Sequence, residues 1–278
     1  MRLLVCSLED IASVNIRDRL LESADWRDGG VFCGRPLLMH RNDALVTIEE
    51  RHLFADDIDE RVREATGQEI DCVVFLSRHK AASGIPTLTV HPIGNFAQKA
   101  EYGGRPGMLV PSAPDLMTSL LRSMQLHGVG LGYQISFEVT HHGPFLRSPT
   151  LYLEIGSSEG QWPDVKAGEA LARCLLETDV LKAPKAIGLG GGHYAPRFSE
   201  VASKKKVSIG HMIPNHFADE ASDEDIIQAV GKAIAASEGA GLVYIHKKSM
   251  PRSRATHLKG LVKRSGAEAI DSSDLEDL

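Results

Sequence analysis

The order of apolar and polar positions along the chain predicts strands and helices that alternate. Cys72–Leu76 is continuously apolar, as expected of a strand buried on both faces of a sheet. Tyr133–Thr140 and Leu151–Ile155 alternate with a period of two, which is typical of strands with one buried face. Apolar positions three and four residues apart predict helices, and Pro163–Thr178 has the clearest such pattern.

Alternating strands and helices predict an α/β fold. Right-handed crossovers would give three layers, with helices on both faces of one twisted, mixed and largely parallel sheet. We expect one domain over residues 1–270 and a disordered acidic tail over 271–278. The further predicted strands are Leu3–Ser7, Arg35–His40, Asp43–Ile48, Thr87–His91, Ala186–Leu189, Val207–Met212 and Leu242–His246. The further predicted helices are Ile11–Glu22, Asp57–Thr66, Ala113–His127, Pro196–Lys204, Asp223–Ser237 and Ser253–Ser265. Residues 92–111, rich in glycine and proline, predict a long loop, which in compact domains is usually functional or mobile.

Composition places the chain among ordinary water-soluble proteins, with 42% hydrophobic and 24% charged residues. No apolar run approaches the roughly 18 residues that cross a bilayer, and the first residues predict a strand instead of a signal peptide. The four cysteines are scattered, as expected of reduced thiols. We therefore expect a cytoplasmic monomer that binds neither membranes nor DNA.

Positive charge gathers near the carboxyl end although the formal net charge is −6. Seven lysines and arginines and no acidic residue lie between His246 and Arg264, among them Lys259 and Lys263. Such a patch could contact phosphates, because counterion release depends on the contacted cations and not on the total charge. The other interpretation is a solvated helix face.

Histidines and glutamates at predicted strand ends are the main candidates for chemistry. Imidazole and carboxylate groups are ligands of Zn²⁺, and a catalytic zinc lowers the pKa of its bound water to about 7. We take His141, His142, Glu154, Glu159 and His193 as candidate catalytic residues, and His79, His91, His141 and His211 as candidate metal ligands. Any one of these histidines could instead have a structural hydrogen-bonding role.

Two glycine-containing turns offer other chemistry. Gly190, Gly191 and Gly192 follow a predicted strand, and their backbone N–H groups could hold an oxyanion or phosphate. Gly156–Gly160 matches the G-x-S-x-G nucleophile elbow, which would make Ser158 a nucleophile activated by His193 or His211. Ser158 could equally cap the helix that follows.

Five motifs in order resemble a known family over nearly the whole chain. They are Ser77–Lys80, Leu88–Asn95, Thr140–Trp162, Gly188–Phe198 and Gly210–His216. Together they resemble the archaeal-type D-aminoacyl-tRNA deacylases, a type also found in plants. The resemblance implies hydrolysis of the ester that joins a D-amino acid to tRNA, with Zn²⁺ as cofactor. It also implies a fold shared with peptidyl-tRNA hydrolase and purine nucleoside phosphorylase.

A tRNA substrate gives roles to further residues. Arg78 and Lys80 could contact acceptor phosphates, and Tyr194 could stack on the terminal adenine. We expect Asn95 and Gly190–Gly192 to contact the substrate as well, and Lys259, Lys263 and Arg264 to dock the acceptor stem. Other possibilities are a metallo-hydrolase of another small ester or amide, the Ser158 hydrolase, and a non-catalytic RNA-binding protein.

Overall fold

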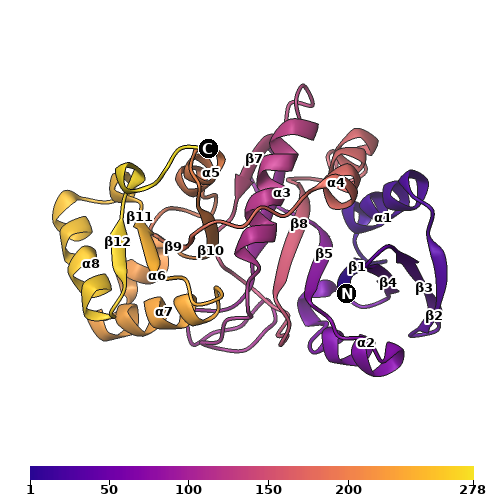
Figure 1. Ribbon diagram of the computed structural model, residues 1–278, viewed down its shortest axis with the longest axis horizontal. Helices are drawn as coiled ribbons and strands as arrows, with labels where there is room; N and C mark the ends of the chain where they lie inside the picture. The colour runs from indigo at the N-terminus through magenta and orange to yellow at the C-terminus, as the bar shows by residue number, and fades with distance from the viewer.

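Two sheets placed side by side carry the strands of the computed structural model, which describes all 278 residues (Figure 1). The larger sheet has eight strands in the order β2-β3-β4-β1-β5-β8-β6-β7. Its strands are β1 Arg2–Ser7, β2 Arg27–Phe32, β3 Arg35–His40, β4 Asp43–Ile48, β5 Cys72–Arg78, β6 Thr87–Pro92, β7 Gln134–Phe137 and β8 Thr150–Gly156. The smaller sheet has the order β10-β9-β11-β12, with β9 Lys185–Leu189, β10 Ser208–Ile213, β11 Leu242–Ile245 and β12 Glu268–Ile270.

Strand direction makes the larger sheet mixed and the smaller one parallel. β1 pairs in parallel with β4 and β5, and β5 in parallel with β8, whereas β6 runs antiparallel to β8. The smaller sheet is parallel throughout. The predicted α/β class with a mixed, largely parallel arrangement is confirmed, although the strands form two sheets and not one.

Eight helices cover the sheets (Figure 1). They are α1 Ile11–Ser23, α2 Ile58–Thr66, α3 Pro114–His127, α4 Val165–Glu177, α5 Pro196–Lys204, α6 Asn215–Glu220, α7 Asp223–Ala235 and α8 Arg252–Arg264. Helices α1, α3 and α4 pack on one face of the larger sheet, and α2 packs on the other. Helices α7 and α8 cover one face of the smaller sheet. None of the helices is long and apolar enough to cross a membrane.

A single apolar core of 38 buried residues runs through both sheets. It contains Leu4 and Leu151 of the larger sheet, Leu120 of α3, and Phe198 and Ile209 from the side of the smaller sheet. Two further cores lie beneath α2 and between α7, α8 and the smaller sheet. The predicted helices and strands are present with small shifts at their ends, because their apolar stripes supply these cores.

Three short elements are absent from the sequence-based prediction. β2 is an edge strand with an exposed surface, so it lacks the apolar alternation that reveals a strand. α6 has six residues and β12 has three, which is too short to show a period. Residues 271–278, expected to be a disordered tail, form a short 3-10 turn and pair with Lys205 and Lys206 near the end of α5.

A seam between the sheets is built by the segment that follows β7. Ala195 N–H donates to Phe137 O, and Val139 N–H donates to His193 O, each at 3.0 Å. Thr140 N–H donates to Met212 O at 3.1 Å, and Thr140 Oγ1 accepts from Met212 N–H at 2.9 Å. The fully buried His211 strengthens the seam, with Nδ1 3.0 Å from Thr140 Oγ1 and Nε2 2.9 Å from the carbonyl oxygen of Val110.

His211 makes stability sensitive to acid. Burial lowers the pKa of His211 to about 4, from an ordinary value of 6.5, so the unfolded chain binds the proton more tightly than the folded protein. Between pH 6.5 and 4 this residue therefore reduces the unfolding free energy by up to about 1.4 kcal/mol per pH unit as the pH falls. We expect His211→Gln to be less stable than wild type at pH 7 but to lose less stability across that interval. Urea denaturation at a series of pH values measures both effects.

The control for this experiment is His40→Gln, at a partly exposed histidine of β3 whose Nδ1 lies 3.0 Å from Asp25 O. It should keep the wild-type dependence on pH. If His211→Gln shows the same slope as wild type below pH 6.5, His211 is not held neutral by the fold.

Candidate active site

A cleft of about 960 Å³ opens between the two sheets and contains most of the candidate chemistry. The ends of β1 and β5, with residues 51–53, form one side, and α6 and α7 beside the smaller sheet form the other. The predicted loop after β6 lines the cleft with residues 94–99 and with Glu101 and Tyr102. Lys232 Nζ of α7 donates to Gly107 O at 2.9 Å, which ties this loop to the smaller sheet.

Glu138, just beyond the end of β7, lies at the centre of a group of histidines. Its side chain has 0% exposure, and its carboxylate contacts three imidazoles. Oε2 lies 3.0 Å from His193 Nε2 and 3.6 Å from His141 Nε2, while Oε1 lies 3.1 Å from His79 Nδ1. Burial raises the pKa of Glu138, but the close contacts with His193 and His79 outweigh it and hold the pKa well below its usual range.

A second buried carboxylate completes the group. Glu154 Oε2 of β8 lies 3.6 Å from both His79 Nδ1 and His91 Nε2. Burial opposes ionisation, yet the contacts with His79 and His91 lower the pKa of Glu154 to about 2. Burial also opposes the charged form of His79, but the contacts with Glu138 and Glu154 outweigh it and raise the pKa of His79 to about 11. Two carboxylates and an imidazolium therefore share one buried site.

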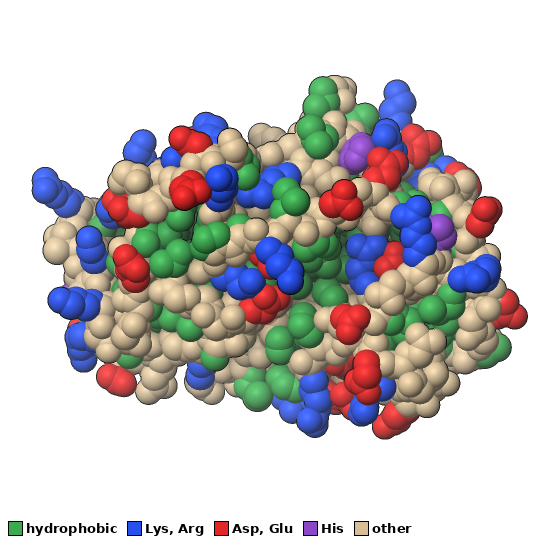
Figure 2. Space-filling view, in the orientation of Figure 1, with side chains coloured by type: hydrophobic (Ala, Val, Ile, Leu, Met, Phe, Trp, Pro, Cys, Tyr) green, Lys and Arg blue, Asp and Glu red, His purple; other side chains and the backbone are tan.

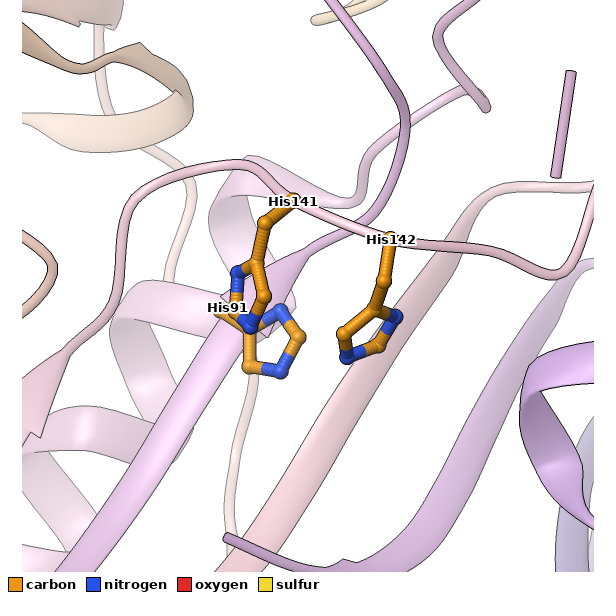
Figure 3. A group of neighbouring side chains, drawn as sticks. All are labelled: His91, His141 and His142. Carbon is orange, nitrogen blue, oxygen red and sulfur yellow. The ribbon is translucent and has the colours of Figure 1, made fainter. Parts of the chain in front are cut away.

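His91, His141 and His142 face a common space beside this group (Figure 3). Each Nδ1 lies against a backbone carbonyl oxygen: 3.1 Å from Pro92 O for His91, 2.7 Å from Val139 O for His141 and 2.6 Å from Gly143 O for His142. Since a carbonyl oxygen only accepts, each Nδ1 carries a proton, so a neutral ring has its lone pair on Nε2. Burial opposes the charged form of His91, but its contact with Glu154 outweighs burial and raises the pKa of His91, so His91 is the charged ring of the three when no metal is bound. Burial, with repulsion from His91, lowers the pKa of His142 to about 3 and that of His141 well below 6.5.

Several candidate residues from the sequence are brought to the cleft or to its border. Arg78 and Lys80 line it, and the guanidinium of Arg78 lies 4.9 Å above the ring of Trp162. Asn95 also lines it, but its amide donates to Gly103 O at 3.0 Å and so holds the loop. The hydroxyl of Tyr194 lies 2.9 Å from His79 Nε2, which places Tyr194 behind the histidines as a partner of His79.

Two of the three glycine amides that we expected to bind an anion, those of Gly190 and Gly191, are not free. Gly190 N–H donates to Ile213 O at 2.8 Å, and Gly191 N–H donates to Asn215 Oδ1 and Ser249 Oγ at 3.1 Å. These amides cannot hold an oxyanion while they bond to protein groups. Gly190 and Gly191 both have a positive φ, which glycine adopts without strain. They turn the chain from the end of β9 toward the exposed Gly192 and then His193.

Three other candidates lie outside the cleft. Glu159 is exposed beyond the end of β8, and Ser158 Oγ donates to Gln161 Oε1 at 2.7 Å with no histidine partner. The serine-hydrolase alternative is therefore not favoured. His211, a candidate metal ligand, has both ring nitrogens occupied in the seam and does not join the histidine cluster.

The basic segment forms α8, on the outer side of the smaller sheet and away from the cleft (Figure 1). Lysine and arginine side chains project from that end of the molecule, as Figure 2 shows in blue. Lys259, Lys263 and Arg264 form no ion pair, so they are available to a phosphate-bearing partner. Acceptor-stem docking by these three residues stays a prediction.

Sequence patterns did not identify Glu138 as a site residue. It occupies a polar position of an alternating strand, where a glutamate normally faces solvent. Its burial arises because residues 193–195 pair with residues 137–139 from more than 50 positions away. Phe96 and Phe217 were also missed, although both line the cleft. The only available signal was that Glu138 lies three residues before His141 in the sequence.

The charge state of His79 is testable in the metal-free protein. Because Glu138 Oε1 is the nearest acceptor to His79 Nδ1, we expect Glu138→Gln to lower the pKa of His79 by one unit or more. ¹⁵N NMR of the imidazole between pH 5 and 11 measures it. The control is Glu159→Gln, an exposed glutamate outside the cleft, which should leave the titration unchanged. An unchanged titration in Glu138→Gln would contradict the assigned ion pair.

Comparisons with known proteins agree on one family. The model of the D-aminoacyl-tRNA deacylase family matches residues 66–270. A D-aminoacyl-tRNA deacylase of Methanosarcina acetivorans is 36% identical over 99% of this chain and 93% of its own. That of Thermoplasma acidophilum is 37% identical over 83% of this chain and 85% of its own.

Two further comparisons show how much of the chain and of the fold is shared. The deacylase of Methanococcoides burtonii is 37% identical over 99% of this chain, which spans only 57% of that relative's length. A crystal structure of a conserved protein of unknown function superposes with a TM-score of 0.86 at 30% identity. The superposition covers 99% of this chain and 96% of the other, so the two-sheet fold is shared. This chain belongs to the D-aminoacyl-tRNA deacylase family.

Proposed function

We propose that this protein hydrolyses the ester that joins a D-amino acid to the 3′ end of tRNA. The observation that carries the proposal is the cleft in which buried carboxylates hold several imidazoles beside a space large enough for an aminoacyl-adenosine. Membership in the deacylase family supports the choice of substrate. The products would be free D-amino acid and tRNA that can be charged again.

His193 is the proposed general base. Its side chain is 47% exposed, and Nε2 lies 3.0 Å from the buried carboxylate of Glu138. Nδ1 has no partner in the protein and takes a proton from water as that water attacks the ester carbonyl carbon. Glu138 orients the ring and stabilises the imidazolium that forms. His193 then returns the proton to the departing ribose oxygen.

We propose that His91, His141 and His142 hold Zn²⁺. The residues fit this ion because each Nδ1 has a carbonyl partner, as is usual for metal-bound histidines, and the ligand atoms lie within 4.8 Å of one another. The buried Nε2 of His91 has no hydrogen-bond partner in the protein, which supports the same choice. When bound, the ion would polarise the ester carbonyl and lower the pKa of water.

Basic residues at the rim of the cleft are the proposed contacts for phosphates of the tRNA end. Arg51, Arg78, Lys80 and Lys99 line the cleft, and none of them forms an ion pair. Such contacts position a nucleic acid without reading its sequence. α8 could then engage the acceptor stem further along. The proposed setting is the cytoplasm, which suits four free cysteines, with the protein acting as a monomer.

The first test measures release of D-tyrosine and L-tyrosine from charged tRNA by the purified, chelator-treated and zinc-restored protein. We expect D-selective release that falls at least 100-fold after chelation and returns with Zn²⁺. His91→Ala should bind no zinc, as measured by metal analysis. Release of D-tyrosine that is indifferent to chelation would remove the metal from the mechanism. No release under any condition would refute the proposed function.

The second test compares the catalytic effect of Glu138 with that of Glu159. Both residues follow a strand, but only Glu138 contacts the histidines. We expect Glu138→Gln and His193→Gln each to lower kcat for D-tyrosyl-tRNA by about 10²- to 10⁴-fold, as for loss of general base catalysis. Glu159→Gln should keep the wild-type rate. Rapid-quench kinetics with saturating substrate measure kcat, and circular dichroism verifies folding. Equal losses in all three variants would argue against a specific His193–Glu138 pair.

A further inference from the structure

The two ends of the cleft differ in chemistry. The end formed by the larger sheet presents charged and polar side chains, such as Glu9, Arg51 and Arg78. The end formed by the smaller sheet and the loop after β6 also presents charged side chains, such as Glu220 and Lys232, but it holds an apolar patch formed by Phe96, Pro214 and Phe217. A substrate that reacts at the histidines can therefore place an apolar or aromatic part against this patch.

The rings of Phe96 and Phe217 lie against each other in this apolar patch. Their ring centroids are 5.5 Å apart with an interplanar angle of 38°. Both side chains are partly buried, because they pack against the core beneath α7 and α8, yet both line the cleft. The proposed hydrolysis gives them no role. Aromatic rings fixed on one side and open on the other are typical platforms for a stacked nucleobase.

We propose that Phe96 and Phe217 form the subsite for the 3′-terminal adenine of the charged tRNA. This inference rests on the proposed function, because the ester carbonyl at the histidines is covalently attached to the ribose of that adenosine. The base must then lie within one nucleoside of His141 and His193, at an end of the same cleft. The chain has only 5% aromatic residues, so an open aromatic pair at this place is unusual.

A neighbouring amide suits the edge of an adenine. Gln228 of α7 lines the same end, is exposed, and has no hydrogen-bond partner for its side chain. A glutamine amide can donate to adenine N7 and accept from the adenine amino group, which is the usual pairing of this side chain with adenine. The amino-acid part is then directed toward the end formed by the larger sheet, where the ammonium group can meet Glu9.

The test measures binding of the trinucleotide CCA and of the same trinucleotide with an abasic terminal ribose, by fluorescence titration. We expect wild type to bind CCA at least fivefold more tightly than the abasic form, since one stacked base contributes about 1–3 kcal/mol. Phe217→Leu and Phe96→Leu keep apolar bulk against the core but should reduce this preference to twofold or less. Gln228→Ala should weaken binding of CCA more than binding of the abasic form. The control is Phe54→Leu, at a phenylalanine that is 57% exposed and outside the cleft.

A kinetic measurement distinguishes a base from an amino-acid side chain at this subsite. If the rings bind adenine, Phe217→Leu should raise KM by the same factor for D-tyrosyl-tRNA and D-alanyl-tRNA. A loss confined to D-tyrosyl-tRNA would assign the rings to the amino acid and overturn the inference. So would wild-type binding that ignores the terminal base. Base-dependent CCA binding without any release of amino acid would refute the proposed hydrolysis and leave the subsite intact.

Discussion

Burial of two negative charges is the constraint on which the site depends. Glu138 and Glu154 are almost inaccessible to water, and an unpaired carboxylate in such a place would lose its charge or destabilise the fold. Imidazoles from four separate segments prevent this, and His79 contacts both carboxylates. His79 is thus held by the same charges that it neutralises, so its position and its protonation state have one cause.

The seam between the sheets explains how such distant residues meet. Residues 137–140 leave the larger sheet, pair with residues 193–195 and contact β10. Each of these segments therefore presents its polar side chains into the same gap. Backbone hydrogen bonds hold this seam together, so the side chains beside it can serve the cleft. A site at the junction of two sheets can combine side chains that neither sheet could bring together alone.

The sequence predicted the regular elements well and the site only in part. The apolar runs of β5 and β8 and the stripe of α4 decide their structure locally, so their patterns were sufficient. Motifs also singled out His91, His141 and Glu154, which the fold brings together. Glu159 and His211 looked equivalent because sequence shows residue type but not the partner. Whether an imidazole nitrogen meets a carbonyl oxygen, as in His211, depends on pairings between segments about 100 residues apart.

The core that runs through both sheets has a consequence for how the chain can be divided. Leu120 of α3 packs in the same cluster as Leu151 of the larger sheet and Ile209 of the smaller one. Cutting the chain between α4 and β9 would expose to water the apolar surface that each fragment buries against the other. The two sheets therefore cannot be replaced independently of each other. A replacement for either sheet would need an apolar face that fits the remaining one.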